Sequence, residues 1–261
     1  MPKFAANLTM LFNELPFLER FEAAAAAGFD AVEFLFPYDY GVSELQECLR
    51  ANRLQLVLHN FPAGHWSVGE RGIACLPERV VEFRESVLVA VRYAKALGCT
   101  QLNCLAGIHT DVHDPAELHR TFVGNLKFAA QALAEAQLTL LIEPINTRDI
   151  TNFFLSSPRQ AFAIMQAVGA PNLKLQYDVY HAQIMEGDLS RTIENLLPHI
   201  AHMQIADTPG RHEPGTGEIN YEFLFRLIDR LGYQGWIGCE YKPRGQTLAG
   251  LAWMRELTST S

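Results

Sequence analysis

Oxygen-bearing side chains close four apolar segments in the second half of the chain. The stretch "TLLIEPIN" (139–146) passes from aliphatic residues straight into Glu143, and three later apolar runs end at or near Asp178, Gln204 and Glu240. Successive members of this set lie roughly one strand–helix unit apart in the sequence. Burying a carboxylate without a partner costs several kcal/mol, so we expect these side chains to face a common partner.

A metal ion is the partner that this set of residue types favours. Three carboxylates in one cleft repel one another strongly unless a cation neutralises them. Carboxylate and amide oxygens suit a hard divalent ion such as Mg2+ or Mn2+ better than a thiolate-type zinc site. The alternative is that each residue caps a loop or pairs with a nearby arginine or lysine.

Short β-like runs alternate with longer helical patterns along the whole chain. In the helical pieces the apolar residues recur three or four positions apart, and several pieces end in glycine, at Gly28, Gly98, Gly169 and Gly232. The expected strands are 3–8, 31–36, 54–59, 101–106, 138–143, 173–178, 201–206 and 236–240. The expected helices are 17–29, 42–53, 79–98, 117–136, 157–169, 188–199 and 220–232, with a possible eighth at the C-terminus.

This alternation predicts an α/β protein with a parallel sheet. At 261 residues the usual solution is a single (β/α)8 TIM barrel, so we predict one domain over residues 1–261. An open doubly wound sheet is the structural rival, but no G-x-G-x-x-G follows the first strand. In a barrel the four oxygen-bearing residues would meet on one rim, at the carboxyl ends of strands five to eight.

The composition of the chain limits the kinds of partner that the protein could bind. A formal net charge of −8 argues against nucleic acid, because phosphate binding needs a basic surface. The five cysteines are odd in number and include no C-x-x-C pair, so we expect no disulfide framework and favour a reducing, cytoplasmic location. We see no signal peptide and no long apolar run, and so expect no membrane partner. A homo-oligomer is possible, although no helix shows an apolar stripe beyond its core face.

Several long motifs carry a resemblance to a known family. They are "LHNFPAG" (58–64), "GERGIACLP" (69–77), "LLIEPIN" (140–146), "LQYDVYH" (175–181), "QIADTPGRHEPGTGEINY" (204–221) and "GCEYKP" (238–243). These stretches resemble the hydroxypyruvate isomerase family of xylose-isomerase-like TIM barrels, which also include 2-oxo-tetronate isomerases and ketose 3-epimerases. The resemblance extends from "FAANLTMLF" (4–12) to "GLAWM" (250–254).

The resemblance implies a divalent metal held by Glu143, Asp178, Gln204 and Glu240, with Glu143 and Glu240 as the acid/base pair. The related epimerases have a histidine in place of Gln204. His202 points to the same face of the strand and is a rival ligand, but it would lie deeper in the barrel, so we favour Gln204.

The implied reaction interconverts hydroxypyruvate and 2-hydroxy-3-oxopropanoate. Such an aldose–ketose isomerisation needs a base, an acid and a Lewis acid that stabilises an enediolate, and two glutamates across a metal supply all three.

The substrate's carboxylate should meet an arginine or a histidine pair. Arg211 and His181 are best placed, Arg71 is a further candidate on the loop after strand three, and His59 ends that strand on the same rim. Asp149 occupies the position at which the epimerases place a substrate-contacting carboxylate. Surface ion pairs are the competing interpretation for the arginines, and a core histidine for His59.

Other residues could support or wall the site. Glu33 would be an inward-facing supporting group or an ion-pair partner, while Phe12, Phe36 and Trp66 fall on rim loops and could exclude water. Three other functions stay open: a longer-substrate isomerase or epimerase, a phosphodiesterase of the endonuclease IV type, and a non-catalytic sugar-acid binding module. The endonuclease would need extra histidine ligands and a basic face, and two intact glutamates disfavour the binding module.

Overall fold

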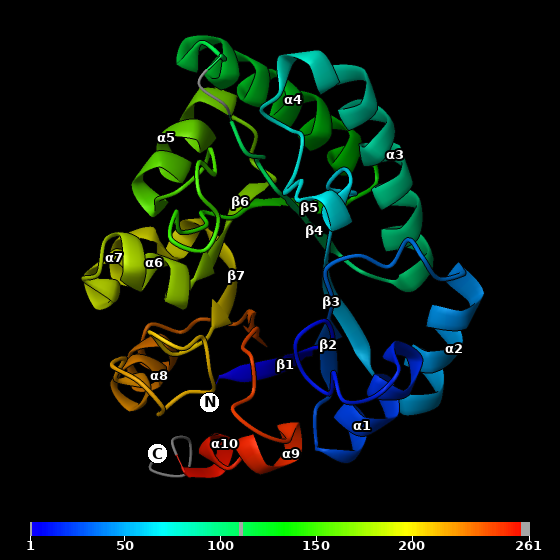
Figure 1. Cartoon of the computed structure of the whole chain (residues 1–261), viewed down its shortest axis with the longest axis vertical. Coiled ribbons are helices and arrows are strands. Elements are labelled where there is room, and N and C mark those ends of the chain that lie inside the picture. The colour runs from blue at the N-terminus through cyan, green and yellow to red at the C-terminus, as the bar shows by residue number, and fades with distance from the viewer. Residues whose placement is uncertain (1, 110–111, 257–261) are drawn as a thin grey trace.

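Eight parallel strands form a closed barrel in the computed structural model, which describes residues 2–109 and 112–256. Each strand pairs with its sequence neighbours, and β1 closes the ring against β8. Figure 1 shows the helices surrounding the strands. The strands are β1 (Lys3–Asn7), β2 (Ala31–Glu33), β3 (Gln55–Asn60), β4 (Gln101–Cys104), β5 (Thr139–Ile142), β6 (Leu173–Asp178), β7 (Ile200–Ile205) and β8 (Trp236–Cys239).

The longer helices of the outer layer each bury an apolar face. The long α4 shows why: Leu118, Phe122, Leu126 and Leu133 recur at helical spacing and are all buried. The helices are α1 (Arg20–Ala26), α2 (Val42–Asn52), α3 (Val80–Leu97), α4 (Pro115–Glu135), α5 (Pro158–Val168), α6 (Val179–Met185), α7 (Leu189–Leu196), α8 (Tyr221–Arg230), α9 (Thr247–Gly250) and α10 (Trp253–Glu256). Short 3-10 turns are η1 (Phe17–Glu19), η2 (Trp66–Val68), η3 (Pro77–Arg79) and η4 (Leu197–His199).

The predicted barrel is confirmed, and all eight expected strands are present within a few residues of their expected bounds. Gly98 and Gly169 adopt left-handed backbone conformations at the ends of α3 and α5, as the helix-end pattern predicts. The possible C-terminal helix is realised as α9 and α10, which lie between α8 and α1 in Figure 1. Trp253 of α10 packs edge-on against Phe4 of β1, with ring centroids 5.1 Å apart.

One helix was not expected. The sequence pattern showed no break after 173–178, yet α6 begins directly at Val179, with Asp178 as its N-cap. Within the described ranges no helix is long and apolar enough to cross a membrane.

Candidate active site

A cavity of about 520 Å³ opens at the carboxyl ends of the strands. The loops after β1, β2, β3, β4, β5, β7 and β8, together with α6, contribute to its wall. Its lining residues are Thr9, Met10, Leu35, Trp66, Arg71, Leu105, Glu143, Ile145, Asp149, Ile150, His181, Arg211, Glu240 and Lys242. Six predicted site residues therefore meet at this cavity: Glu143, Glu240, His181, Arg211, Arg71 and Asp149.

Two glutamates enter the cavity from β5 and β8. Glu143 directly follows β5 and Glu240 directly follows β8, and both are buried. Burial raises the pKa of Glu143 well above its ordinary value, and the nearby carboxylates of Glu240 and Asp178 add to the rise. Burial also raises the pKa of Glu240 to about 8, against the opposing charge of Arg211. Both carboxyls therefore hold a proton more readily than an exposed glutamate does.

Asp178 presents one bound and one unbound oxygen. Its Oδ1 accepts hydrogen bonds from the backbone N–H groups of Tyr180 (2.7 Å) and His181 (3.2 Å), which begin α6. Its Oδ2 is buried without a hydrogen-bond partner among the described residues. Burial raises the pKa of this carboxyl to about 6, although Arg211 and both backbone donors oppose the rise. An unsatisfied buried carboxylate oxygen calls for a ligand.

His181 is held as a neutral donor. Its Nδ1 accepts a hydrogen bond from the backbone N–H of Asn146 at 3.3 Å and also faces the side-chain nitrogen of Asn146 at 2.6 Å. The ring proton then lies on Nε2, which points toward Glu143 Oε1 at 3.9 Å and Asp178 Oδ2 at 3.8 Å. Burial lowers the pKa of His181 well below its ordinary value, so the ring is uncharged.

Arg211 supplies a buried cation. Its guanidinium lies 3.6 Å from Asp149 and 3.5 Å from Glu240, and over the ring of Tyr180. Neither carboxylate is a hydrogen-bond acceptor for it in the described structure, and Nε is buried without any partner there. The backbone of Arg211 has a φ of 55°, a left-handed conformation that costs a non-glycine residue about 1–2 kcal/mol.

Asp207 organises the loop that carries Arg211. Its Oδ1 accepts the backbone N–H groups of Thr208 and Ile219, and its Oδ2 those of Gly215 and Gly217. A Cβ at Gly217 would lie 2.0 Å from Thr208 O, so only glycine fits there. We define residues 207–219 as the arginine loop. This internal hydrogen bonding holds the strained Arg211 in place.

The opposite wall comes from the loop after β3. The guanidinium of Arg71 stacks on Trp66 at 4.0 Å from the ring centroid and donates to the carbonyl oxygens of Trp66 and Glu70. Phe36 also packs against Trp66, with the two ring centroids 4.9 Å apart. Beyond Trp66 lies a further cavity of about 480 Å³, which the same tryptophan lines.

Gln204 and His59 are buried and do not belong to the described lining of the cavity. Gln204 Nε2 donates to Glu33 Oε1 at 2.7 Å, and its Oε1 accepts from Gln176 Nε2 at 2.6 Å. His202 contacts Glu33 at 2.6 Å rather than the cavity, so it lies deeper, as expected. His59 Nδ1 lies 3.1 Å from Asn60 O, and burial lowers its pKa to about 4. The roles predicted for Gln204 and His59 stay predictions.

The described residues offer one cluster of acidic and histidine side chains with metal-ligand spacing. Ligand atoms of Glu143, Asp178 and His181 all lie within 4.8 Å of one another. The predicted metal-binding carboxylates Glu143 and Asp178 are thus brought together, with His181 beside them, whereas the predicted ligand Glu240 lies outside this cluster.

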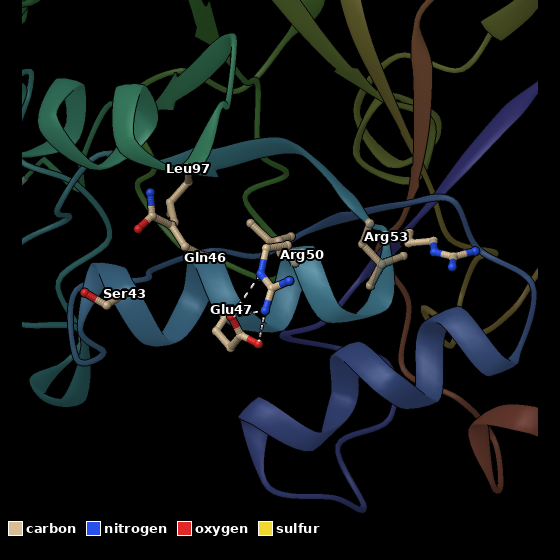
Figure 2. Close-up of a pocket in the computed structure, with 8 residues that line it drawn as sticks. Ser43, Gln46, Glu47, Arg50, Arg53 and Leu97 are labelled. Atoms are coloured by element: carbon tan, nitrogen blue, oxygen red, sulfur yellow. Dashed lines mark hydrogen bonds and ion pairs between the residues drawn. The ribbon is translucent and has the colours of Figure 1, made fainter.

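A second groove, of about 610 Å³, runs along α2 away from the barrel mouth (Figure 2). Arg50, which lines it, is neutralised by a bidentate contact with Glu47 of the same helix. This surface lacks the buried, pKa-shifted groups of the barrel cavity.

Sequence reasoning missed several supporting residues. Asn103 at the end of β4 donates to Glu143 Oε2 at 2.8 Å, Asn146 orients His181, Asp207 ties the arginine loop, and Lys242 lines the cavity. The available signal was position: Asn103 lies within the predicted strand 101–106, and Asn146 and Lys242 come shortly after the predicted strands 138–143 and 236–240.

Comparisons with known proteins agree with this geometry. A family model described as a xylose isomerase-like TIM barrel matches residues 21–257. The chain belongs to this family.

Within that family the chain resembles isomerases over nearly its whole length. It is 53% identical to the hydroxypyruvate isomerase of Escherichia coli (strain K12), covering 97% of this chain and 98% of that protein. It is 50% identical to the 2-oxo-tetronate isomerase of Cupriavidus necator, covering 98% of each. A crystal structure described as an AP endonuclease, family 2, from Brucella melitensis superposes with a TM-score of 0.96 at 48% identity, covering 98% of this chain and 99% of that one. The chain is therefore an enzyme of the isomerase type.

Proposed function

We propose that this enzyme interconverts hydroxypyruvate and 2-hydroxy-3-oxopropanoate. The observation that carries the proposal is the placing of Arg211, whose buried Nε has no partner among the described residues, beside two glutamates that line the same cavity. A three-carbon oxo acid has the matching chemistry: one carboxylate for the guanidinium and two adjacent oxygen-bearing carbons for the acid/base pair. The similarity to an enzyme named hydroxypyruvate isomerase supports the same assignment.

The residues present fit a divalent metal ion. Asp178 Oδ2 is buried and lacks a partner in the described structure, and it lies close to Glu143. We assign Glu143, Asp178 and Glu240, with the amide oxygen of Gln204, as the ligands, because an all-oxygen set suits Mg2+ or Mn2+. When bound, the ion would act as a Lewis acid that stabilises the negative charge on the substrate's two oxygens.

The protein's own groups perform the proton transfers. Arg211 binds the substrate carboxylate, and the Nε2–H of His181 donates to a substrate oxygen. One glutamate removes a proton from C3, and the electron pair left behind forms the enediolate between C2 and C3. The other glutamate delivers a proton to C2, and the proton of the C3 hydroxyl passes to the C2 oxygen, so that C3 becomes the aldehyde and C2 carries the hydroxyl. In the reverse direction the two glutamates exchange roles.

A specific observation favours 2-oxo-tetronate as the second candidate substrate. The cavity is roomy for a three-carbon acid, and a further cavity adjoins it at Trp66. One relative is named for that activity.

An endonuclease function is less well supported, because the formal charge of −8 does not suit a DNA-binding surface. Five free cysteines suit a reducing compartment, so we place the reaction in the cytoplasm.

Proton NMR in D2O tests the assignment. Purified protein with Mn2+ or Mg2+ is followed with hydroxypyruvate and separately with 2-oxo-tetronate, with and without EDTA. We expect the semialdehyde to form with deuterium at C2, and Glu143→Gln to abolish both turnover and deuterium entry. Faster conversion of 2-oxo-tetronate would change the substrate and keep the mechanism. Absence of turnover of either acid by folded, metal-loaded protein would refute the proposal.

A further inference from the structure

A cluster of buried polar side chains lies in the barrel interior around Glu33, the last residue of β2. The carboxylate of Glu33 is fully buried and meets three side-chain donors: Asn7 Nδ2 at 2.9 Å, His202 Nε2 at 2.6 Å and Gln204 Nε2 at 2.7 Å. Gln101 Nε2 lies 3.2 Å from His202 Nδ1. An amide nitrogen can only donate, so Nδ1 accepts and the ring proton lies on Nε2, facing Glu33.

This carboxylate determines which end of the Gln204 amide faces which strand. A carboxylate with three donors around it accepts from each, so Gln204 must present its nitrogen to Glu33. The amide oxygen consequently faces β6, where it accepts from Gln176 Nε2 at 2.6 Å. Asp178 lies two residues further along β6 and is the register partner of Gln204.

The backbone is adapted to this arrangement at three points. The β2–β3 register shifts between Val32 and Glu33, and the β6–β7 register shifts between Leu175 and Gln176. Both irregularities thus fall at residues that contact the Gln204 amide, and such bulges re-aim side chains next to active sites. A Cβ at Gly238, the β8 partner of Gln204, would lie 2.3 Å from both oxygens of Glu33. Only glycine leaves room for the carboxylate.

We propose that Glu33, supported by His202, is a positioning residue that holds the Gln204 amide oxygen toward the metal-binding carboxylates. The proposal rests on the proposed function, in which Gln204 is a ligand. In Glu33→Gln an N–H group replaces one acceptor oxygen. Because Gln101 keeps the His202 proton on Nε2, the new amide turns its oxygen toward His202 and its N–H group toward the Gln204 nitrogen. The Gln204 amide then turns over, so that its oxygen accepts from the new N–H group and its own N–H groups, which repel a cation, face β6, the strand that ends in Asp178.

Binding of Mn2+ alone is the test, measured by the EPR signal of free Mn2+ at increasing metal concentration. We expect E33Q to weaken Mn2+ binding about 10- to 100-fold, the range typical of groups that orient a ligand. Adding E33Q to Q204A should change the dissociation constant less than twofold, because Glu33 acts only through Gln204. The control is N125A on α4, which removes the buried hydrogen bond that Asn125 donates to Ala74 O and should lower the melting temperature without changing Mn2+ affinity.

A second pair of variants keeps the proposal testable if E33Q does not fold. H202Q retains an N–H donor toward Glu33 and should bind Mn2+ as the parent does, whereas H202L loses the donor and should bind several-fold more weakly. Unchanged affinity in E33Q, or equal affinity in H202Q and H202L, would overturn the proposal and leave the metal site standing. Failure of the folded parent protein to bind Mn2+ would instead overturn the metal assignment, and the role of Glu33 with it.

Discussion

The buried carboxyl of Glu240 should make the protein without metal less stable as the pH rises. Burial raises its pKa from 4.5 to about 8, which corresponds to about 5 kcal/mol at 1.36 kcal/mol per pKa unit. Between these two pH values the folded protein holds a proton that the unfolded chain has released. The free energy of unfolding therefore falls as the pH rises through this window.

Glu240→Gln removes this loss of stability with rising pH, because an amide does not ionise. With EDTA present we expect the variant and the parent to melt at similar temperatures at pH 5. At pH 9 the variant should be more stable by up to about 5 kcal/mol, which is on the order of 10 °C for a chain of this size. Mn2+ should reverse the order at pH 9, because the ion stabilises only the ionised parent site.

Thermal melts followed by circular dichroism between pH 5 and pH 9 would measure this difference. Glu47→Gln is the matched control: Glu47 is an exposed carboxylate on α2, and its replacement should give no such divergence between pH 5 and pH 9. A constant difference between parent and E240Q across the whole range would refute the argument that the Glu240 carboxyl is protonated near neutral pH.

Three further predictions concern the cavity wall. Arg211→Met should raise KM for hydroxypyruvate about 100-fold, because charge-assisted hydrogen bonds to the substrate carboxylate are lost. Steady-state kinetics measures this, with Arg50→Met as the control variant. An unchanged KM would show that Arg211 does not bind substrate. Trp66→Ala should join the two cavities and shift the ratio of the kcat/KM values for the two acids about 10-fold in favour of 2-oxo-tetronate. Competition assays with both acids measure this ratio. A shift in favour of hydroxypyruvate would contradict the role of Trp66 as a wall. Asp207→Asn should lower the free energy of unfolding by about 2–4 kcal/mol, because an amide N–H would then face backbone N–H groups; denaturant titration measures it, and KM should rise as well if the arginine loop loosens.

The strands and the rim residues were predictable because their signals are local. Leu140, Leu141 and Ile142 are buried on both faces of β5, as a parallel strand between helices requires, so an unbroken apolar run identified it. Glu143 and Glu240 follow from the rule that barrel strands end at the active site.

The sequence predicted Glu33 as an inward-facing supporting group or an ion-pair partner, but the identity of its partners was beyond sequence reasoning for a physical reason. Glu33 and His202 are separated by 169 residues, and they meet only because β1 closes the ring against β8. No local pattern encodes which inward-facing side chains touch across a barrel. The helix α6 was missed because its N-cap, Asp178, is also the last residue of a strand, so no turn residues separate the two elements.

The arginine loop has a consequence for how substrate range can diverge on this barrel. Its hydrogen bonds run mainly between its own residues, and two contacts with Lys242 and one with Arg244 join it to the segment after β8. The opposite wall, with Trp66 and Arg71, belongs to a separate loop after β3. Insertions or exchanges in the loop after β3 can therefore enlarge or reshape the pocket while Arg211 stays in place. In the proposed function, this arrangement separates Arg211, which anchors the substrate carboxylate, from a wall that limits the chain length of the acid.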